Sequence, residues 1–498
     1  MQFKRYARPF AAAAIVLPVL AACGGSDNST DPTVRSTQFG QVTGVNDSGA
    51  SGTLSWKGIP YAKAPVGALR WKAPADPEPW ATARSVKSFA PACVQYGRIY
   101  GPGANNTWDA TIGTTLNQAV GSEDCLYLNV WRPAGDSSNL PVIVFYHGGS
   151  NVSGYTADPV YDGANLARTA NAVVVTVNFR LGIFGFMNMP QLKTGDASND
   201  SGNFAILDSI KALQFVNKNI ASFGGDPGNV TIMGQSAGAI NVYALLTSPL
   251  SSSNGQGLFA RAVVLSGCDG GTALPPLSFV EQAGVNFAVR KGIAQDDPQA
   301  LDKLRALPPA EVVDGMNLAN RPAGDPPTYV GPFADGKLAI DSARAFQEGR
   351  FARVPVMIGA TSADIGGKTG FMVAGGRKLA GTLAGQGAPV YAYRFSYVAE
   401  SVKEPGAQHA TDIPFFFDTA AIKYGPQTSA RDRAMGKAMS AYLVNFAKRG
   451  DPNGAGLPAW PRYARASDEI MDFAAGGKPV AEKDPWGSEI DAAQATRQ

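Results

Sequence analysis

Residues 229–246 read NVTIMGQSAGAINVYALL, and within this stretch Ser236 stands between two glycines. The β-branched run NVTIMG before the serine predicts a strand, and the residues from Ala237 onward predict a helix. A G-x-S-x-G match is a weak signal in a chain with 57 glycines. A strand-to-helix boundary, however, is where a sharp turn can lift a serine hydroxyl clear of a sheet. Ser236 is therefore a candidate nucleophile, to be weighed against a small residue in an ordinary turn.

The sequence around this stretch alternates strand-like and helix-like segments. Several of the strand-like runs are continuously apolar, which is typical of strands buried on both faces of a parallel sheet. The pattern predicts an α/β fold, with a large, mostly parallel central sheet and helices on both faces. The expected strands lie within 125–133, 140–149, 171–182, 229–234, 261–267, 353–366 and 388–396, and the expected helices within 201–227, from 237 and within 435–453.

Polar and small residues follow several of the expected strands. His147, Gly149, Ser236 and Ser266 each come just after a strand-like run. Because chemistry in such sheets gathers at the carboxyl ends of the strands, one rim could hold several of these residues.

A serine hydroxyl needs a base, and the chain has only two histidines, His147 and His409. His409 lies downstream in loop-like sequence, and we interpret it as the base. Asp364 lies between Ser236 and His409 and directly follows an apolar run, which makes it the preferred acid. The chain order Ser, acid, His is that of α/β-hydrolases. His147 is interpreted as architectural, and the competing acids are Asp325, Asp335 and Asp341.

An ester or amide carbonyl that is attacked by serine also needs donors for its developing oxyanion. The segment HGGS, residues 147–150, ends a strand-like run and can present backbone N–H groups. The N–H of Ala237, at the start of the expected helix, is the third candidate donor.

The N-terminal residues 1–22 are predicted to be a lipoprotein signal peptide. Basic residues precede a short apolar run that ends in LAAC, so that Cys23 would be lipidated, and residues 23–35 have linker composition. An ordinary signal peptide with a coincidental cysteine is the alternative. Gly24 after the cysteine favours the outer membrane. Residues 36–498 are then a single domain, and its oligomeric state stays open.

Composition excludes other classes of function. Removal of residues 1–22 lowers Lys+Arg from 43 to 40, against 40 Asp+Glu, which leaves no electrostatic footprint for nucleic acid. The sequence has no CxxC motif and no cluster of cysteines and histidines that would support a metal site. Cys93 and Cys125 would close a loop of 32 residue steps, and Cys268 is expected to be a small buried residue.

Several separated motifs resemble those of the type B carboxylesterases, which are cholinesterase-like α/β-hydrolases. The resemblance runs from about residue 36 to 475. It implies an α/β-hydrolase fold, Ser236 as nucleophile, His409 as general base and acid, and Asp364 as its orienting acid. The motifs are WKGIPYAKAPVGALRWKAP, SEDCLYLNVWRP, YHGGS, NFRLGIFGF and FGGDPGNVTIMGQSAGA, with the segments around Asp364 and His409.

The resemblance further implies that Gly149, Ser150 and Ala237 donate to the oxyanion and that Cys93 pairs with Cys125. It implies no metal and no organic cofactor. The expected activity is hydrolysis of a small-molecule carboxylic ester. The protein is expected to contact a membrane only through its N-terminal lipid.

Three departures from the family pattern stand out. Asp364 replaces the usual glutamate, Ser150 replaces a third glycine, and only 45 positions separate Asp364 from His409, about half the usual span. The missing stretch normally supplies helices over the active site, so we predict a shallower pocket that suits bulky esters. Loops 95–120, 151–162, 270–335 and 366–376 are the expected pocket walls.

Two other interpretations compete with a general carboxylesterase. A specialised esterase or amidase, for feruloyl, tannin-type or mycotoxin esters, would use the same residues. A non-catalytic adhesion or binding protein would keep the fold and lose the nucleophile, whereas this chain retains serine, histidine, acid and oxyanion loop.

Overall fold

A computed structural model describes residues 31–96, 118–251, 257–268, 274–316, 318 and 326–496. The predicted signal peptide, Cys23 and the linker up to residue 30 lie outside these residues, as do most of the predicted pocket loop 95–120 and the competing acid Asp325. Within the described residues, no helix combines the length and the apolar character that crossing a bilayer requires.

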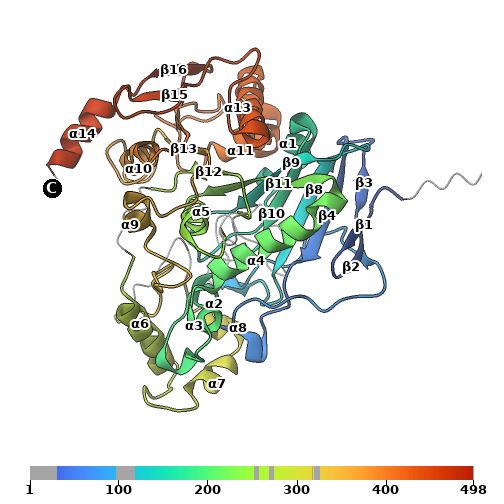
Figure 1. Cartoon of the computed structure of the whole chain (residues 1–498), viewed down its shortest axis with the longest axis vertical. Helices are drawn as coiled ribbons and strands as arrows, with labels where there is room; N and C mark the ends of the chain where they lie inside the picture. Colours follow the sequence, from blue (N-terminus) through green and yellow to red (C-terminus); the bar gives the residue numbers. More distant parts are fainter. Residues whose placement is uncertain are drawn as a thin grey trace, which may run out of the picture.

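The centre of the fold is an 11-stranded sheet that crosses the molecule from β16 to β3 (Figure 1). The seven strands from β15 to β10 run parallel, and antiparallel strands complete both edges. This confirms the predicted mostly parallel sheet. In spatial order the strands are β16 (Pro479–Lys483), β15 (Glu469–Phe473), β14 (Val390–Phe395), β13 (Val356–Thr361), β12 (Arg261–Leu265), β11 (Gly225–Gln235), β9 (Leu140–Tyr146), β10 (Val173–Val177), β8 (Tyr127–Pro133), β4 (Thr53–Pro60) and β3 (Val45–Asp47).

Both faces of the sheet are covered by helices. Along β9, Val142 and Val144 pack into one hydrophobic core while Ile143 and Phe145 pack into the other, because side chains alternate across a strand. The first core contains α4 (Phe204–Asn219), α5 (Ala237–Thr247) and α10 (Val373–Gly385); the second contains α1 (Ala164–Ala170), α11 (Ile413–Phe416) and α13 (Ala430–Arg449).

Shorter elements surround these layers. β1 (Val34–Thr37), β2 (Gly40–Thr43) and β5 (Arg84–Ser85) form a small sheet, and β6 (Gln95–Tyr96) pairs with β7 (Ala119–Val120). The remaining helices are α2 (Gly182–Gly185), α3 (Ala197–Asp200), α6 (Leu277–Arg290), α7 (Ala300–Arg305), α8 (Pro309–Val312), α9 (Ser342–Gln347), α12 (Ala420–Tyr424) and α14 (Gly487–Ala495).

Local capping explains where the predicted helices begin and end. The helix predicted within 201–227 is α4, followed by one 3-10 turn that Gly224 ends with a φ of 83°. The helix predicted over 435–453 begins earlier, at Ala430, because Ser429 and Asp432 form a capping box. Gly450, with a φ of 75°, ends it as expected.

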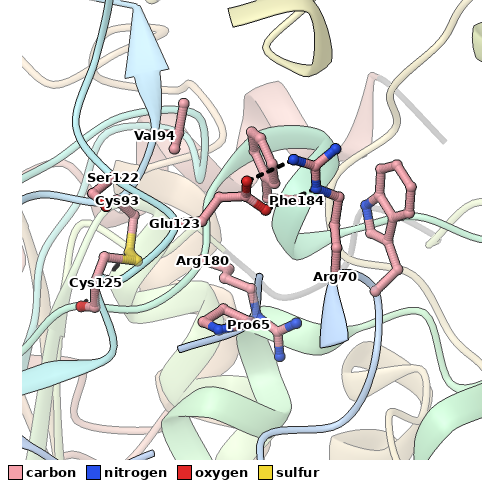
Figure 2. Close-up of a pocket in the computed structure, with 10 residues that line it drawn as sticks. Pro65, Arg70, Cys93, Val94, Ser122, Glu123, Cys125, Arg180 and Phe184 are labelled. Atoms are coloured by element: carbon pink, nitrogen blue, oxygen red, sulfur yellow. Dashed lines mark hydrogen bonds and ion pairs between the residues drawn. A yellow bond between two sulfur atoms is a disulfide. The ribbon is translucent and has the colours of Figure 1, made fainter. Parts of the chain in front are cut away.

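Cys93 and Cys125 form a disulfide, which confirms the pairing that the resemblance implied. Beside it, Arg70 donates two parallel hydrogen bonds to Glu123, of 2.7 and 2.6 Å, and both side chains are buried (Figure 2). The cavity that these residues line has about 10 Å³, room for about one water. The disulfide and the ion pair therefore tie Arg70 and Cys93 to the segment 123–125, and the cavity between them is too small for a substrate.

Candidate active site

Ser236 stands at the turn between β11 and α5, with φ 55° and ψ −121°. The two glycines of the motif make this turn sterically possible. A Cβ on Gly234 would lie 2.2 Å from the Gly238 carbonyl oxygen, and one on Gly238 would lie 2.1 Å from that of Tyr146. The strained backbone at Ser236 and the close packing around it form a sharp strand-to-helix turn at the rim of the sheet, the geometry that a nucleophile elbow requires.

Asp364 lies just beyond β13, and its side chain is fully buried. Its Oδ1 is 2.6 Å from Nδ1 of His409 and also accepts a hydrogen bond of 2.8 Å from the Ile365 N–H. Its Oδ2 accepts hydrogen bonds from the Ser266 hydroxyl and from the N–H and hydroxyl of Thr361, at 2.6, 3.1 and 2.9 Å. Every lone-pair direction of the carboxylate is therefore used, and its orientation is set from several sides.

The same contacts determine the charge of Asp364. Burial by itself would raise the pKa of this carboxyl group, but the hydrogen bond and charge of His409 and the hydrogen bond from Ser266 outweigh burial and lower it. Asp364 is therefore ionised at neutral pH and holds the proton of His409 on Nδ1, which leaves Nε2 of the ring to accept a proton.

Backbone contacts compensate for the shorter side chain of aspartate. The N–H of Ala363 donates to the Ala407 carbonyl at 2.8 Å, and the Ala407 N–H donates to the Ser362 hydroxyl at 3.0 Å. The loop that carries His409 is thus held against the end of β13. This close approach brings the imidazole within reach of an aspartate where the family usually has glutamate.

Gln235, which sequence reasoning did not single out, contacts the other side of the imidazole. Its amide nitrogen lies 3.2 Å from Nε2 of His409. With the Nδ1 proton directed at Asp364, this amide donates to Nε2. Because Gln235 directly precedes Ser236, the contact also holds the imidazole over the elbow. The sequence could have drawn attention to Gln235, because it occupies the first x of the G-x-S-x-G motif, next to the serine.

The loop predicted to bind the oxyanion packs against the elbow. A Cβ on Gly148 would lie 3.1 Å from Cβ of Ser236. Gly149 has a φ of 109°, and Ser150 and Asn151 both have a φ of 55°, so Ser150 adopts the left-handed conformation that a third glycine would favour. Asn151 is joined to Asn241 of α5 by two amide hydrogen bonds of 3.2 and 3.0 Å.

His147 directly follows β9 and begins this loop. Its imidazole is buried and stacks on Phe179 with ring centroids 4.6 Å apart, and its Nδ1 is 2.8 Å from the carbonyl oxygen of Gly148. These contacts agree with the architectural interpretation. Among the competing acids, Asp341 caps α9 and Asp335 accepts from the backbone of 337–339, so both have structural partners.

A second buried carboxylate, Asp412, lies three residues after His409 and was also missed. Its Oδ2 accepts a hydrogen bond of 2.9 Å from the Tyr393 hydroxyl, and its Oδ1 has no hydrogen-bond partner among the described residues. Burial raises the pKa of Asp412 to about 6, with the nearby charge of Asp364 adding to the effect. Nothing in the local sequence distinguishes it from a solvated aspartate, because its burial comes from the aromatic side chains of α11 and β14.

Within the described residues, no three or more His, Cys, Asp or Glu side chains gather as a metal site would require. A strained serine, an imidazole with an oriented Nδ1 proton, and a loop of left-handed residues meet at the carboxyl ends of β9, β11 and β13.

Comparisons with known proteins give this arrangement a context. The sequence profile of the Carboxylesterase family matches residues 31–376 and 367–485. The chain is 30% identical to the para-nitrobenzyl esterase of Bacillus subtilis, over 88% of this chain and 94% of that protein. It is 31% identical to the fumonisin B1 esterase of Sphingopyxis macrogoltabida, over 93% and 89%.

Solved structures agree with these relatives. A PNB esterase superimposes with a TM-score of 0.77 and 28% identity, over 92% of this chain and 99% of that one. A carboxylesterase of Geobacillus stearothermophilus superimposes with a TM-score of 0.75 and 30% identity, over the same shares of the two chains. The chain therefore belongs to the carboxylesterase family: it has the α/β-hydrolase fold and is a serine hydrolase of carboxylic esters.

Proposed function

We propose that Ser236, His409 and Asp364 form the catalytic triad and that the N–H groups of Gly149, Ser150 and Ala237 bind the oxyanion. The observation that carries this proposal is the 2.6 Å contact between Asp364 and Nδ1 of His409, in a loop that lies over the strained elbow of Ser236. Nε2, on the opposite side of the ring, faces Gln235, the residue that directly precedes the serine. The left-handed φ of Ser150 supports its role as a donor where a glycine is usual.

The mechanism is acyl transfer in two steps. Nε2 of His409 exchanges the Gln235 amide for the Ser236 hydroxyl and takes its proton as the hydroxyl oxygen attacks the ester carbonyl. The imidazolium then protonates the leaving alcohol. Asp364 remains ionised and stabilises the imidazolium. The three amides donate hydrogen bonds to the negative oxygen of each tetrahedral intermediate and so stabilise it. Water attacks the acyl-enzyme by the same route and releases the acid.

The test is covalent labelling with a fluorophosphonate probe. Ser236→Ala should abolish labelling and lower hydrolysis of p-nitrophenyl acetate by at least about a thousandfold, whereas Ser85→Ala, at an exposed position, should leave both unchanged. Persistent labelling of Ser236→Ala, or an adduct mapped to another residue, would overturn the assignment.

We further propose that the pocket is open and accepts bulky esters. Between Asp364 and His409 the chain, which is described throughout, forms α10 and β14, and α10 packs on β13 and β14 as part of the sheet covering. This stretch therefore adds no helix above the site. The similarity to a fumonisin B1 esterase supports a specialised bulky ester as the second candidate substrate. Cleavage of short acetates with no turnover of any feruloyl or polycyclic ester would contradict this proposal.

Finally, we propose that the protein is an exported lipoprotein of the outer membrane, anchored through Cys23. The support is the LAAC sequence followed by a linker, together with a disulfide, which suits an oxidising compartment. The protein should partition into the detergent phase of a phase-separation assay, and Cys23→Ser should move it to the aqueous phase. An unchanged distribution would refute the anchor.

A further inference from the structure

A cavity of about 80 Å³ lies beside α5, away from the disulfide region. It is bounded by the start of α4, by α5 and by the segments that contain Cys268, Leu274 and residues 332–342. In Figure 1, α5 lies between α4 and α9, and it contacts both helices. The volume is several times the 10–15 Å³ or so that a single water needs. Its apolar walls are formed mainly by Ile206, Ile240, Ala244, Leu274, Phe333 and Ile340.

The polar side chains in the wall are already satisfied by the protein. The amide of Asn203 donates to the Phe333 carbonyl at 3.0 Å and accepts from its N–H at 3.2 Å. The Tyr243 hydroxyl donates to the Cys268 carbonyl at 2.9 Å, and the Ser342 hydroxyl is 3.1 Å from that of Thr247. The wall therefore offers a ligand little beyond dispersion and burial, which favours a hydrocarbon over water or a polar group.

One face of α5 leads from Ser236 toward the cavity. From Ser236 to Thr247 every residue is buried except Ser236, Ile240 and Ala244, which are half-buried. Their spacing of four places them above one another on one side of the helix. Ile240 and Ala244 line the cavity, so this half-buried stripe begins at Ser236 and ends at the cavity wall.

We propose that this cavity is a binding site for an unbranched hydrocarbon chain of the ester substrate, with Ile240 and Ala244 setting the length that fits. The inference rests on Ser236 being the nucleophile, as proposed above. A linear chain is favoured because the half-buried residues between Ser236 and the cavity follow a single helix face and the walls are largely aliphatic. Both the acyl and the alcohol part of an ester can supply such a chain.

The first experiment measures kcat/KM across p-nitrophenyl esters with acyl chains of two to twelve carbons. While added methylenes enter the cavity, each should raise kcat/KM about fourfold, the equivalent of about 0.8 kcal/mol. Ala244→Leu should lower the octanoate-to-acetate ratio by about sixtyfold, because its added carbons occupy the space of roughly three methylenes. Ile240→Ala should move the optimum to longer chains.

The matched control is Ala310→Leu on α8, where the side chain is exposed and the ratio should not change. A folded Ala244→Leu that keeps the wild-type chain-length dependence in both the acyl esters and the alkyl acetates would refute the inference. Should Ala244→Leu fail to fold, an unchanged chain-length optimum in Ile240→Ala refutes it instead. A parallel series of alkyl acetates decides the source: the length dependence appears there if the alcohol chain enters, and in the acyl series if the acid chain does.

A second measurement separates this inference from the triad assignment. In Ser236→Ala, hexyl methanethiosulfonate should label Cys268, forming a mixed disulfide with release of methanesulfinate, because the thiol belongs to the cavity wall. Dodecanol should slow this labelling. If the wild type shows no chain-length selectivity and Cys268 is not labelled, the proposed hydrocarbon site is rejected. If Ser236→Ala remains active, the triad assignment is rejected instead.

Discussion

The fully buried carboxylate of Asp412 allows a quantitative prediction of stability. Asp412→Asn removes a group whose pKa is raised from 3.8 to about 6 by burial. Between those pKa values the folded protein binds more protons than the unfolded chain. The wild type therefore loses stability as the pH rises from about 4 to about 6, and this group restores none of that stability above pH 6. A difference of about two pKa units corresponds to about 3 kcal/mol.

The neutral amide avoids this loss. Its oxygen can still accept from the Tyr393 hydroxyl, while its nitrogen would stand where Oδ1 now has no partner, at a cost of about 1 kcal/mol. Asp412→Asn should therefore be slightly less stable than the wild type at pH 4 and about 2 kcal/mol more stable at pH 8. Urea denaturation across this pH range, with the disulfide intact, measures the difference.

The matched control is Asp296→Asn at an exposed position, for which the difference from the wild type should stay within about 0.5 kcal/mol at every pH. A difference between Asp412→Asn and the wild type that does not change between pH 4 and pH 8 would refute the reasoning. It would mean that Asp412 either stays ionised at both pH values or gains its missing partner in solution.

Three further changes test the site and its frame. Asp364→Asn should lower kcat/KM for p-nitrophenyl acetate by about a thousandfold or more, because an amide NH₂ facing Nδ1 of His409 favours the wrong tautomer; a loss below tenfold would contradict the triad. Gln235→Glu should move the acid limb of the kcat/KM profile about one pH unit higher, since a carboxylate beside the imidazole stabilises its protonated form, and Gln235→Leu should not. Replacing both Cys93 and Cys125 by serine should lower the free energy of unfolding by about 3–4 kcal/mol, measured by urea denaturation against the oxidised protein.

Much of the architecture was predictable because it is encoded locally. Apolar runs such as 140–146 predicted strands buried on both faces, and β9 is buried throughout. The glycines around Ser236 predicted a sharp turn, and the structure gives the reason, which is backbone contact closer than any Cβ permits. The start of α13 was placed five residues late because the apolar pattern was followed and the cap at Ser429 was not.

By itself the sequence determined the order of strands and helices and the turn at Ser236, because each depends on residues that are neighbours along the chain. The apolar run before Asp364 also made it the predicted acid. Tertiary structure alone decided which groups surround that acid. Ser266 and His409 contact Asp364 across 98 and 45 positions, and Gln235 reaches His409 across 174. It also decided that Asp412 is buried and that a hydrocarbon-sized space opens beside α5. Burial, protonation and cavity shape depend on how separate elements pack, and no local pattern specifies them.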